Sequence, residues 1–436
     1  MTETRLDVLD ELTWRGLVAL STDADALRAA FAAGPVTYYC GFDPTAPSLH
    51  MGNLVQLLTM RRLQDAGNDP LALVGGATGL IGDPRMSGER VLNDRETVGA
   101  WVDLLRAQVE RFLDFSGPHP ARMVNNLDWT APLSAIDFLR DVGKHFRVNR
   151  MLSKEAVSAR LNSESGISFT EFSYQILQGM DFLELYQRYR CTLQTGGSDQ
   201  WGNLTAGTDL VHRVTGQNVH LMATPLVTKA DGSKFGKSEG GAIWLDPAMT
   251  SPYAFYQFWL NTGDAEVPGL LRVFTFRTRE EIEELERQAA ERPSARVGQH
   301  ALAEDVTTLV HGADTFQRVR AASRALFGQG DLAAVDERTL ADAFAEVPHT
   351  EVFLKADPGD PDDGGMPTAA DLMVLTGIVA SKSAARRLIA EGGAYLNNQR
   401  VTAEGAVPGH SDLLHDCYLI VRRGKRHVGA VEVRPA

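Results

Sequence analysis

Residues 38–53 read YYCGFDPTAPSLHMGN and predict a strand, a tight turn and a helix in succession. The aromatic start is typical of a strand, DPTAP cannot be helical, and a helix can begin near Ser48. A helix N-terminus presents free N–H groups and a positive dipole end, which attract phosphate. His50 and Asn53 can point the same way, with Gly52 between them leaving room for a flat base. Taken alone, however, an ordinary capped helix with a surface histidine is the simpler interpretation.

The alternation of strand and helix signals continues through about the first 230 residues. Strands are expected at 36–42, 71–76, 121–126, 191–197 and 219–228. Helices are expected at 49–66, 96–115, 170–189 and 200–215. This order favours an α/β fold: a parallel sheet covered by helices on both faces, with ligands at the carboxyl ends of the strands.

The composition narrows the class of protein. A hydrophobic fraction of 44% and a charged fraction of 23% argue against disorder. The absence of a long apolar run predicts no membrane span, and the acidic N-terminus does not resemble a secretory signal. Cys40, Cys191 and Cys417 are odd in number and far apart, which fits a reducing cytoplasm and excludes a cysteine-only zinc site. We therefore expect a cytoplasmic protein.

Charge and composition also divide the chain. The net charge of -13 argues against a general nucleic-acid binder, yet from Ala370 onward nine Lys and Arg face six Asp and Glu, which is +3. Residues 252–344 are rich in Ala, Glu, Arg and Leu and predict a helical region. In residues 358–368, nine of eleven are Pro, Gly or Asp, which predicts a linker. A small basic module is expected after it, with nucleic acid as one possible partner.

Three further segments could carry chemistry. VTKADGSKFGKS (227–238) places Lys229, Lys234 and Lys237 among glycines, as in a loop that closes on polyphosphate, but a solvated turn fits equally well. LVGGATGLIGDP (73–84) allows close backbone approach without being a Rossmann fingerprint or a Walker loop. Its Asp83 is a candidate carboxylate for an ammonium group, although turn capping is the commoner role.

The segment FTEFSYQILQGMDFLELY (169–186) predicts a helix, with Ser168 and Glu171 at capping-box spacing. Tyr174, Gln178 and Asp181 then form one polar stripe with apolar flanks. A stripe of this kind is usually the solvent-exposed face of the helix, and it can bind a substrate only if it points into a cleft. No metal-ligand cluster and no G-x-S-x-G elbow are present in the sequence.

Together, H-x-G-N, GGATGLIGD, TEFSYQILQGMD, GGSDQWGN (196–203) and KFGKS (234–238) resemble the class I aminoacyl-tRNA synthetases, and among them the bacterial tyrosyl-tRNA synthetases. HMGN stands where the class has HIGH, with Asn53 in place of the last His, and KFGKS where it has KMSKS. The resemblance implies a tyrosine–tRNA ligase: L-tyrosine and ATP with Mg²⁺ give tyrosyl-adenylate and pyrophosphate, and tyrosine then passes to the 3′ end of tRNA(Tyr). No tightly bound protein metal is implied.

The resemblance also implies roles for individual residues. Thr45, His50, Lys234 and Lys237 would act on the triphosphate, and Cys40, Gly52, Asn53, Gly197 and Asp199 would complete the ATP site. Tyrosine would be bound by Tyr39 and Asp181 at its phenol, by Asp83, Tyr174 and Gln178 at its ammonium group, and by Gln200 at its carboxylate.

The implied organisation is a Rossmann-like nucleotide-binding domain (1–230), a KMSKS-type connector (231–251), a helical anticodon-arm domain (252–357), the linker (358–368) and a small α+β RNA-binding domain (369–436). Arg386, Arg387, Arg422, Arg423 and Lys425 would contact RNA phosphates. The family is homodimeric, so six basic residues between Arg140 and Arg160 are either an acceptor-arm contact across the dimer or an ordinary charged face.

Three alternatives remain open on the sequence. A tryptophanyl-tRNA synthetase would not need Asp181 paired with Tyr39. A regulatory RNA-binding homologue would have no use for Thr45, His50, Lys234 and Lys237. A small-molecule adenylyltransferase would lack both KFGKS and the basic module.

Overall fold

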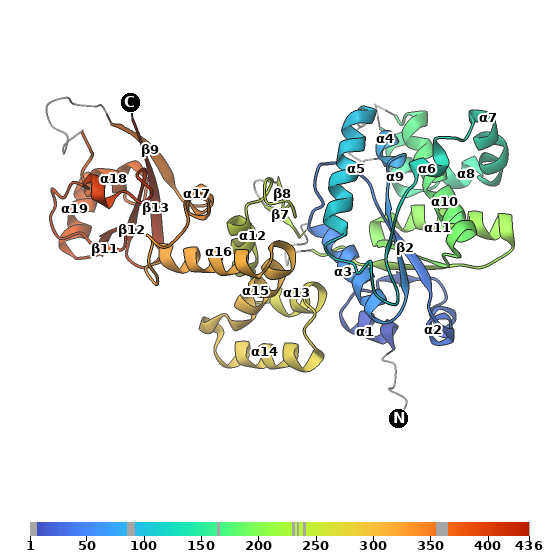
Figure 1. Ribbon diagram of the computed structural model, residues 1–436, viewed down its shortest axis with the longest axis horizontal. Helices are drawn as coiled ribbons and strands as arrows, with labels where there is room; N and C mark the ends of the chain where they lie inside the picture. The colour runs from blue at the N-terminus through green and yellow to red at the C-terminus, as the bar shows by residue number, and fades with distance from the viewer. Residues whose placement is uncertain are drawn as a thin grey trace. The chain divides into compact units, whose positions relative to one another are not determined.

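The computed structural model describes residues 7–84, 92–163, 166–228, 232, 235–238, 241–354 and 365–435. The chain divides into two units (Figure 1). Unit 1 comprises Met1–Met249 and Gly263–Gly298, and unit 2 comprises Thr250–Thr262 and Gln299–Ala436. Within the described part, no helix is long and apolar enough to cross a bilayer.

Unit 1 is built on a six-stranded sheet. Its strands, in spatial order, are β1 (Leu20–Ser21), β6 (His220–Thr224), β5 (Leu193–Gly197), β2 (Thr37–Phe42), β3 (Asp69–Val74) and β4 (Arg122–Asn125). Every neighbouring pair is parallel except β1 with β6. The predicted parallel sheet is therefore confirmed, and the two-residue β1 is the strand that the sequence pattern did not predict.

Alternating side chains of the central strand β2 fix helices on the two faces of this sheet. The Tyr38 hydroxyl donates to the Met60 carbonyl in α3 (Met51–Asp65). The Tyr39 ring packs edge-on against Phe182 of α10 (Phe169–Tyr189), with centroids 5.2 Å apart. Since successive residues of a strand point to opposite faces, α3 and α10 cover opposite faces, as the alternation pattern predicts.

Unit 1 also contains α1 (Val8–Trp14), α2 (Ala24–Ala33), α4 (Thr78–Ile81), α5 (Arg95–Val109), α6 (Leu127–Thr130), α7 (Ala135–Asp137), α8 (Val148–Leu152), α9 (Glu155–Leu161), α11 (Trp201–Thr215), α13 (Val267–Phe274) and α14 (Arg279–Glu291). Helix α5 ends before the predicted residue 115. The chain turns there because the Asp114 carboxylate accepts the amides of Ser116 and Gly117.

Unit 2 contains α12 (Pro252–Leu260), most of α15 (Val297–His311), α16 (Ala313–Leu326) and α17 (Glu337–Ala345). These helices are followed by a five-stranded sheet in the order β11 (Gln399–Arg400), β10 (Ala394–Leu396), β12 (Tyr418–Arg423), β13 (His427–Pro435), β9 (His349–Leu354). Helices α18 (Ala369–Leu375) and α19 (Lys382–Ala390) complete the unit.

Strand β9 corrects the predicted boundary at the linker. It precedes residues 358–368, yet it pairs in parallel with β13, with His349 opposite Ala430. The predicted helical domain 252–357 therefore includes a strand of the following sheet, and its helices end at Ala345. The sequence hides this pairing because β9 gains its partner only from residues beyond the linker.

Candidate active site

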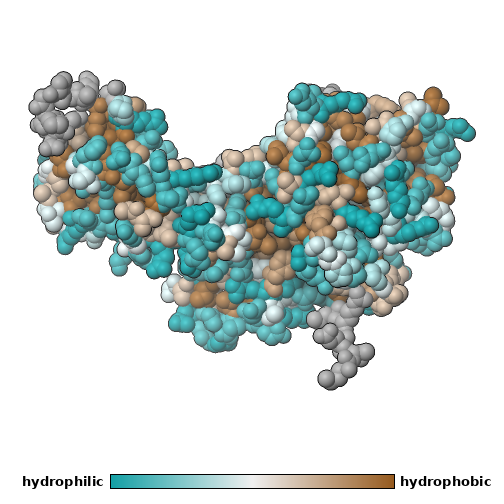
Figure 2. All heavy atoms as spheres, in the orientation of Figure 1, coloured by the Kyte–Doolittle hydropathy of each residue, from teal (hydrophilic) through white to brown (hydrophobic). Residues whose placement is uncertain are grey.

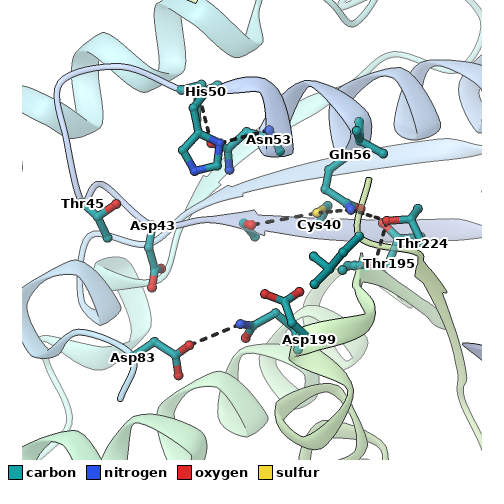
Figure 3. Close-up of a pocket in the computed structure, with 18 of the residues that line it drawn as sticks. Cys40, Asp43, Thr45, His50, Asn53, Gln56, Asp83, Thr195, Asp199 and Thr224 are labelled. Atoms are coloured by element: carbon teal, nitrogen blue, oxygen red, sulfur yellow. Dashed lines mark hydrogen bonds between the residues drawn. The ribbon is translucent and has the colours of Figure 1, made fainter. Parts of the chain in front are cut away.

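A cavity of about 550 Å³ lies at the carboxyl ends of the parallel strands of unit 1 (Figure 3). It is lined by all the residues predicted for tyrosine and by those predicted for ATP whose side chains the structure describes: Tyr39, Cys40, Thr45, His50, Gly52, Asn53, Asp83, Tyr174, Gln178, Asp181, Gly197, Asp199 and Gln200. Segments far apart in the sequence thus meet at the edge of the sheet where a doubly wound fold binds its ligands.

Asp181 and Tyr39 lie together at the buried part of this cavity. The Asp181 carboxylate accepts from Asn126 Nδ2 at 3.0 Å and from Trp129 Nε1 at 2.9 Å. Burial raises the pKa of Asp181 to about 7, although these two hydrogen bonds oppose the rise. The Tyr39 hydroxyl is buried without a hydrogen-bond partner in the described part of the protein. An unsatisfied buried hydroxyl is costly, so a polar ligand atom is expected beside it.

Asp43 is a site residue that the sequence analysis missed. Its carboxylate accepts from Tyr174 Oη at 2.7 Å and from Thr78 Oγ1 at 2.6 Å. A Cβ on Gly75 would lie 2.1 Å from Asp43 Oδ1, so any larger residue there would displace the carboxylate. Gly75 therefore makes room for the Asp43 side chain. The sequence predicts a tight turn at Asp43 before α3, but no local pattern indicates that the Asp43 side chain faces Tyr174.

Asp83 and Gln178 add polar groups next to Tyr174. Asp83 accepts from Gln200 Nε2 at 3.2 Å and from Asn203 Nδ2 at 3.1 Å. Gln178 Oε1 is buried and has no partner among the described residues. The polar stripe of α10 therefore forms a wall of the cavity, and its solvent-face interpretation is wrong. The Asp83 carboxylate and Gln178 Oε1 are acceptors, so this part of the cavity suits a cationic part of a ligand.

His50 is the N-cap of α3, so the helix begins one residue later, at Met51. The Gly52 N–H donates to His50 Nδ1 at 3.1 Å, and the His50 N–H donates to Asn53 Oδ1 at 3.1 Å. In the neutral ring the proton is then on Nε2, because Nδ1 is the acceptor. This arrangement keeps an imidazole donor and the helix N-terminus at the cavity, which suits a phosphate.

Cys40 of β2 and Gln56 of α3 line the cavity, and Figure 3 shows Gln56 between Cys40 and Thr224. Gln56 Nε2 donates to Thr224 Oγ1 at 2.6 Å, and neither residue was singled out from the sequence. Burial raises the pKa of Cys40 to about 12, so the thiol is neutral at physiological pH and is not a nucleophile.

The KFGKS segment is described in part. Lys229 and Lys234 lie outside the described residues, and Lys237 is described through its backbone, in β7 (Lys237–Ser238), which pairs with β8 (Gly241–Ala242). The next residues return to α3, since the Met51 N–H donates to the Ile243 carbonyl at 3.2 Å. The two predicted phosphate-binding segments are therefore joined through backbone hydrogen bonds.

In unit 2, the predicted RNA-binding residues differ in exposure. Arg386, Arg387 and Lys425 are exposed and Arg423 is half-buried. Arg422 is only 6% exposed, its guanidinium lies over the Tyr395 ring at 4.3 Å, and it donates to the Gly424 carbonyl at 2.6 Å. Its predicted contact with RNA is wrong, because this geometry uses the guanidinium inside the protein.

The predicted basic face between Arg140 and Arg160 also contains both exposed and buried side chains. Arg140, Lys144, Arg147 and Arg150 are exposed. Arg160 is 1% exposed and forms a two-bond ion pair with Glu171, at 3.2 and 3.0 Å. Arg160 is therefore a buried link between α9 and α10, and its interpretation as a tRNA contact is wrong. Glu171 is used in this pair, while Ser168 alone caps α10.

Among the described residues, no group of three or more His, Cys, Asp or Glu side chains is arranged to hold a metal ion. The side chains that line the cavity can bind and orient ligands and can stabilise developing charge. The cavity offers carboxylate and amide acceptors at Asp83 and Gln178, and imidazole and amide donors at His50 and Asn53.

Comparison with known proteins agrees with this geometry. Residues 32–328 match the family described as tRNA synthetases class I (W and Y), and residues 340–430 match the tyrosine–tRNA ligase SYY-like C-terminal domain. A tyrosine–tRNA ligase of Streptomyces avermitilis is 67% identical over 98% of this chain and 99% of the relative. One from Acidothermus cellulolyticus is 60% identical, also over 98% and 99%.

Solved structures give the same result. A C-terminally truncated mitochondrial tyrosyl-tRNA synthetase of Coccidioides posadasii is 31% identical, with a TM-score of 0.64, over 72% of this chain and 91% of that one. A tryptophanyl-tRNA synthetase of Encephalitozoon cuniculi shares the fold at 13% identity and a TM-score of 0.52. The full-length identity and the C-terminal match decide between the tyrosine and tryptophan branches. The chain belongs to the tyrosine–tRNA ligases of the class I aminoacyl-tRNA synthetase family.

Proposed function

We propose that this chain activates L-tyrosine with ATP, releasing pyrophosphate, and then transfers the tyrosyl group from the adenylate to the 3′ end of tRNA(Tyr). The observation that carries the proposal is the pair of buried polar groups at Tyr39 and Asp181, which fits a phenol hydroxyl. A phenol can donate to the Asp181 carboxylate and accept from Tyr39. Phenylalanine would leave the Tyr39 hydroxyl unpaired and would offer no donor to Asp181, an effect for which the tyrosyl-tRNA synthetases are the standard example.

The ammonium group of tyrosine is proposed to bind Asp83, Tyr174 and Gln178. The Tyr174 hydroxyl donates its proton to Asp43, so its oxygen can accept a hydrogen bond from the ammonium group of the ligand. Gln178 Oε1 is a second buried acceptor, and the Asp83 carboxylate supplies charge. Gln200, which donates to Asp83, is proposed to lie beside the tyrosine carboxylate.

ATP is proposed to enter as its magnesium complex, with no protein ligand assigned to the ion. Thr45 and His50 would contact the far phosphates, with the His50 Nε2 proton as donor. By the family resemblance, Gly52 and Asn53 would lie at the nucleotide, and Cys40, Gly197 and Asp199 at the ribose. All five residues line the cavity. Lys234 and Lys237 are proposed to stabilise the departing pyrophosphate.

The tyrosine carboxylate itself attacks the α-phosphorus, and the bond from that phosphorus to the pyrophosphate oxygen breaks. No protein nucleophile is needed, which agrees with a neutral Cys40 thiol. Catalysis then consists of holding the two substrates in line and stabilising the charge that develops on the leaving phosphates.

The tRNA is proposed to bind through basic side chains of unit 2, namely the exposed Arg386, Arg387 and Lys425 and the half-buried Arg423. These side chains neutralise phosphates and position the RNA without reading bases. The exposed part of the basic face on unit 1, from Arg140 to Arg150, is proposed to contact the acceptor arm.

We further propose a homodimer formed through the segment from α7 to the start of α10. Large apolar side chains are exposed there: Ile136 at 70%, Leu139 at 55%, Val148 at 59%, Leu152 at 37%, Leu161 at 46% and Phe169 at 73%. Hydrophobic residues reach the surface around α7 and α8 in Figure 2. Large apolar side chains exposed along one segment in this way mark an interface, and a second copy is the occupant that the family suggests. The enzyme is placed in the cytoplasm, in keeping with its three free cysteines.

Exchange of labelled pyrophosphate into ATP, measured with each of the twenty amino acids, tests the proposal. Tyrosine should support exchange, tryptophan should not, and phenylalanine should be weak. Exchange stimulated by tryptophan alone, or by no amino acid, would refute it. Asp181→Ala should abolish tyrosine-dependent exchange in a folded protein, whereas near-normal kcat/KM would contradict the role of the pocket.

A further inference from the structure

Two residues before His50, the turn that leads into α3 is held by a side chain from another helix. Gln108, in the last turn of α5, is 8% exposed and lies outside the cavity. Its Oε1 accepts from the Leu49 N–H at 2.9 Å. The Ser48 hydroxyl lies 3.3 Å from the same oxygen. Leu49 and Ser48 are themselves buried, so these are hydrogen bonds formed away from water.

The same turn is tied to the segment that follows KFGKS. The Asp246 N–H donates to Ser48 Oγ at 3.1 Å, and the Leu245 N–H donates to the Leu49 carbonyl at 2.8 Å. Residues 48 and 49 therefore connect α5 with the return from KFGKS, immediately before the N-cap of α3. Figure 3 shows Thr45 and His50 on the same side of the cavity, joined by this turn.

We propose that Gln108 is a positioning residue for adenylate formation: its side-chain oxygen fixes Ser48 and Leu49, and thereby fixes Thr45, His50 and the return from KFGKS relative to one another. Gln108 touches no substrate and acts through the turn. The inference rests on the proposed function, because the groups that it positions are those assigned to the triphosphate.

The physical argument is one of geometry. Removing the Oε1 acceptor leaves the buried Leu49 N–H without a partner, so the turn must shift to satisfy it. A displacement of about 1 Å at groups that stabilise a transition state can lower the rate about 100-fold. The phenol end of the pocket, at Tyr39 and Asp181, does not contact this turn, so tyrosine binding should be preserved.

The test compares Gln108→Met, which keeps shape but removes the acceptor, with Gln108→Glu, which keeps an oxygen there. Gln108→Met should lower kcat for tyrosine-dependent exchange 10- to 100-fold while KM for tyrosine changes less than twofold. Gln108→Glu should recover most of the rate. Equal losses in both variants, or a loss confined to KM for tyrosine, would overturn the proposal.

Gln64→Met is the matched control. Gln64 is a buried glutamine at the other end of α3, where it holds the backbone of Asp114 and His119. It should lose comparable stability on thermal unfolding with kcat unchanged. If Gln108→Met does not fold, Ser48→Ala provides the test. It removes the hydrogen bond that Ser48 Oγ accepts from the Asp246 N–H, and it should likewise lower kcat while leaving KM for tyrosine unchanged. An unchanged kcat in a folded Ser48→Ala would refute the proposal.

Failure of the two proposals is distinguishable in the same assay. Wild-type protein without tyrosine-dependent exchange would refute the proposed function. Wild-type exchange with equal kinetic losses in Gln108→Met and Gln64→Met would refute only the positioning role of Gln108.

Discussion

Selectivity for tyrosine over phenylalanine should fall as the pH is lowered through about 7. Burial raises the pKa of Asp181 to about 7, and the carboxylate must be ionised to accept from the substrate phenol as well as from Asn126 and Trp129. Below the pKa the group gains a proton, so the competent form decreases with falling pH. At pH 6 it is about a tenth of the total, which predicts an approximately tenfold lower kcat/KM for tyrosine than above pH 8.

The ratio of kcat/KM for tyrosine to that for phenylalanine isolates this effect. Titration of ATP, of the amino-acid ammonium group and of other enzyme groups affects both substrates and cancels in the ratio. Pyrophosphate exchange measured with both amino acids from pH 5.5 to 8.5 provides it. A ratio that stays constant across this range would refute the assignment of Asp181 as an ionising acceptor for the phenol.

Trp129→Phe supplies a second, quantitative check. The indole N–H stabilises the ionised carboxylate, so its loss removes about 1.5 to 3 kcal/mol from the charged form. At 1.36 kcal/mol for each pKa unit, the midpoint of the profile should rise by about 1 to 2 pH units. Trp259→Phe is the control, because Trp259 is another buried tryptophan, in α12, and its replacement should leave the midpoint unchanged. A midpoint unmoved in Trp129→Phe would show that a different group titrates.

Other substitutions test the buried charges and the unit boundaries. Arg160→Met should destabilise unit 1 by about 3 to 5 kcal/mol, because it leaves the buried Glu171 carboxylate without its partner, and adding Glu171→Leu should recover most of the loss. Urea unfolding measures both stabilities, and a double variant no more stable than Arg160→Met would contradict this. Arg386→Gln should weaken tRNA binding and reduce its salt slope by about one, whereas Arg422→Met should lower thermal stability and leave the salt slope unchanged; fluorescence titrations at several salt concentrations separate them. A chain ending before β9 should retain tyrosine activation, lose tRNA charging and remain soluble. A chain ending just after β9 should aggregate, because that strand has lost its partner β13. Equal behaviour of the two chains on size-exclusion chromatography would refute the assignment of β9 to the C-terminal sheet.

The sequence was most informative where a pattern is local. Strand and helix alternation predicted the parallel sheet, and the spacing of Tyr174, Gln178 and Asp181 placed them on one face of α10. Whether that face met solvent or a cavity depends on packing against distant segments, and spacing does not contain that information. The family resemblance supplied it.

The missed and wrong assignments share a cause. Asp43, Asn126 and Gln108 act through partners far away in the sequence, and no short motif marks them. Arg is usually exposed, which favours a surface role for Arg160 and Arg422. In the structure, however, Arg160 is buried in an ion pair with a carboxylate, and Arg422 is buried against an aromatic ring and a carbonyl. Burial of a paired charge leaves no trace in composition.

The parallel pairing of β9 with β13 has a consequence for how unit 2 acquires its structure. Strands β10, β12 and β13 join neighbours close in the chain, so this antiparallel part can form early, as hairpins do on the microsecond scale. Bringing His349 beside Ala430 requires closing a long loop first, and such distant contacts slow a folding reaction. Addition of β9 to the edge of the sheet is therefore expected to be the late step of refolding. The helices of unit 2 and its sheet should become protected from hydrogen exchange together only when this step is complete.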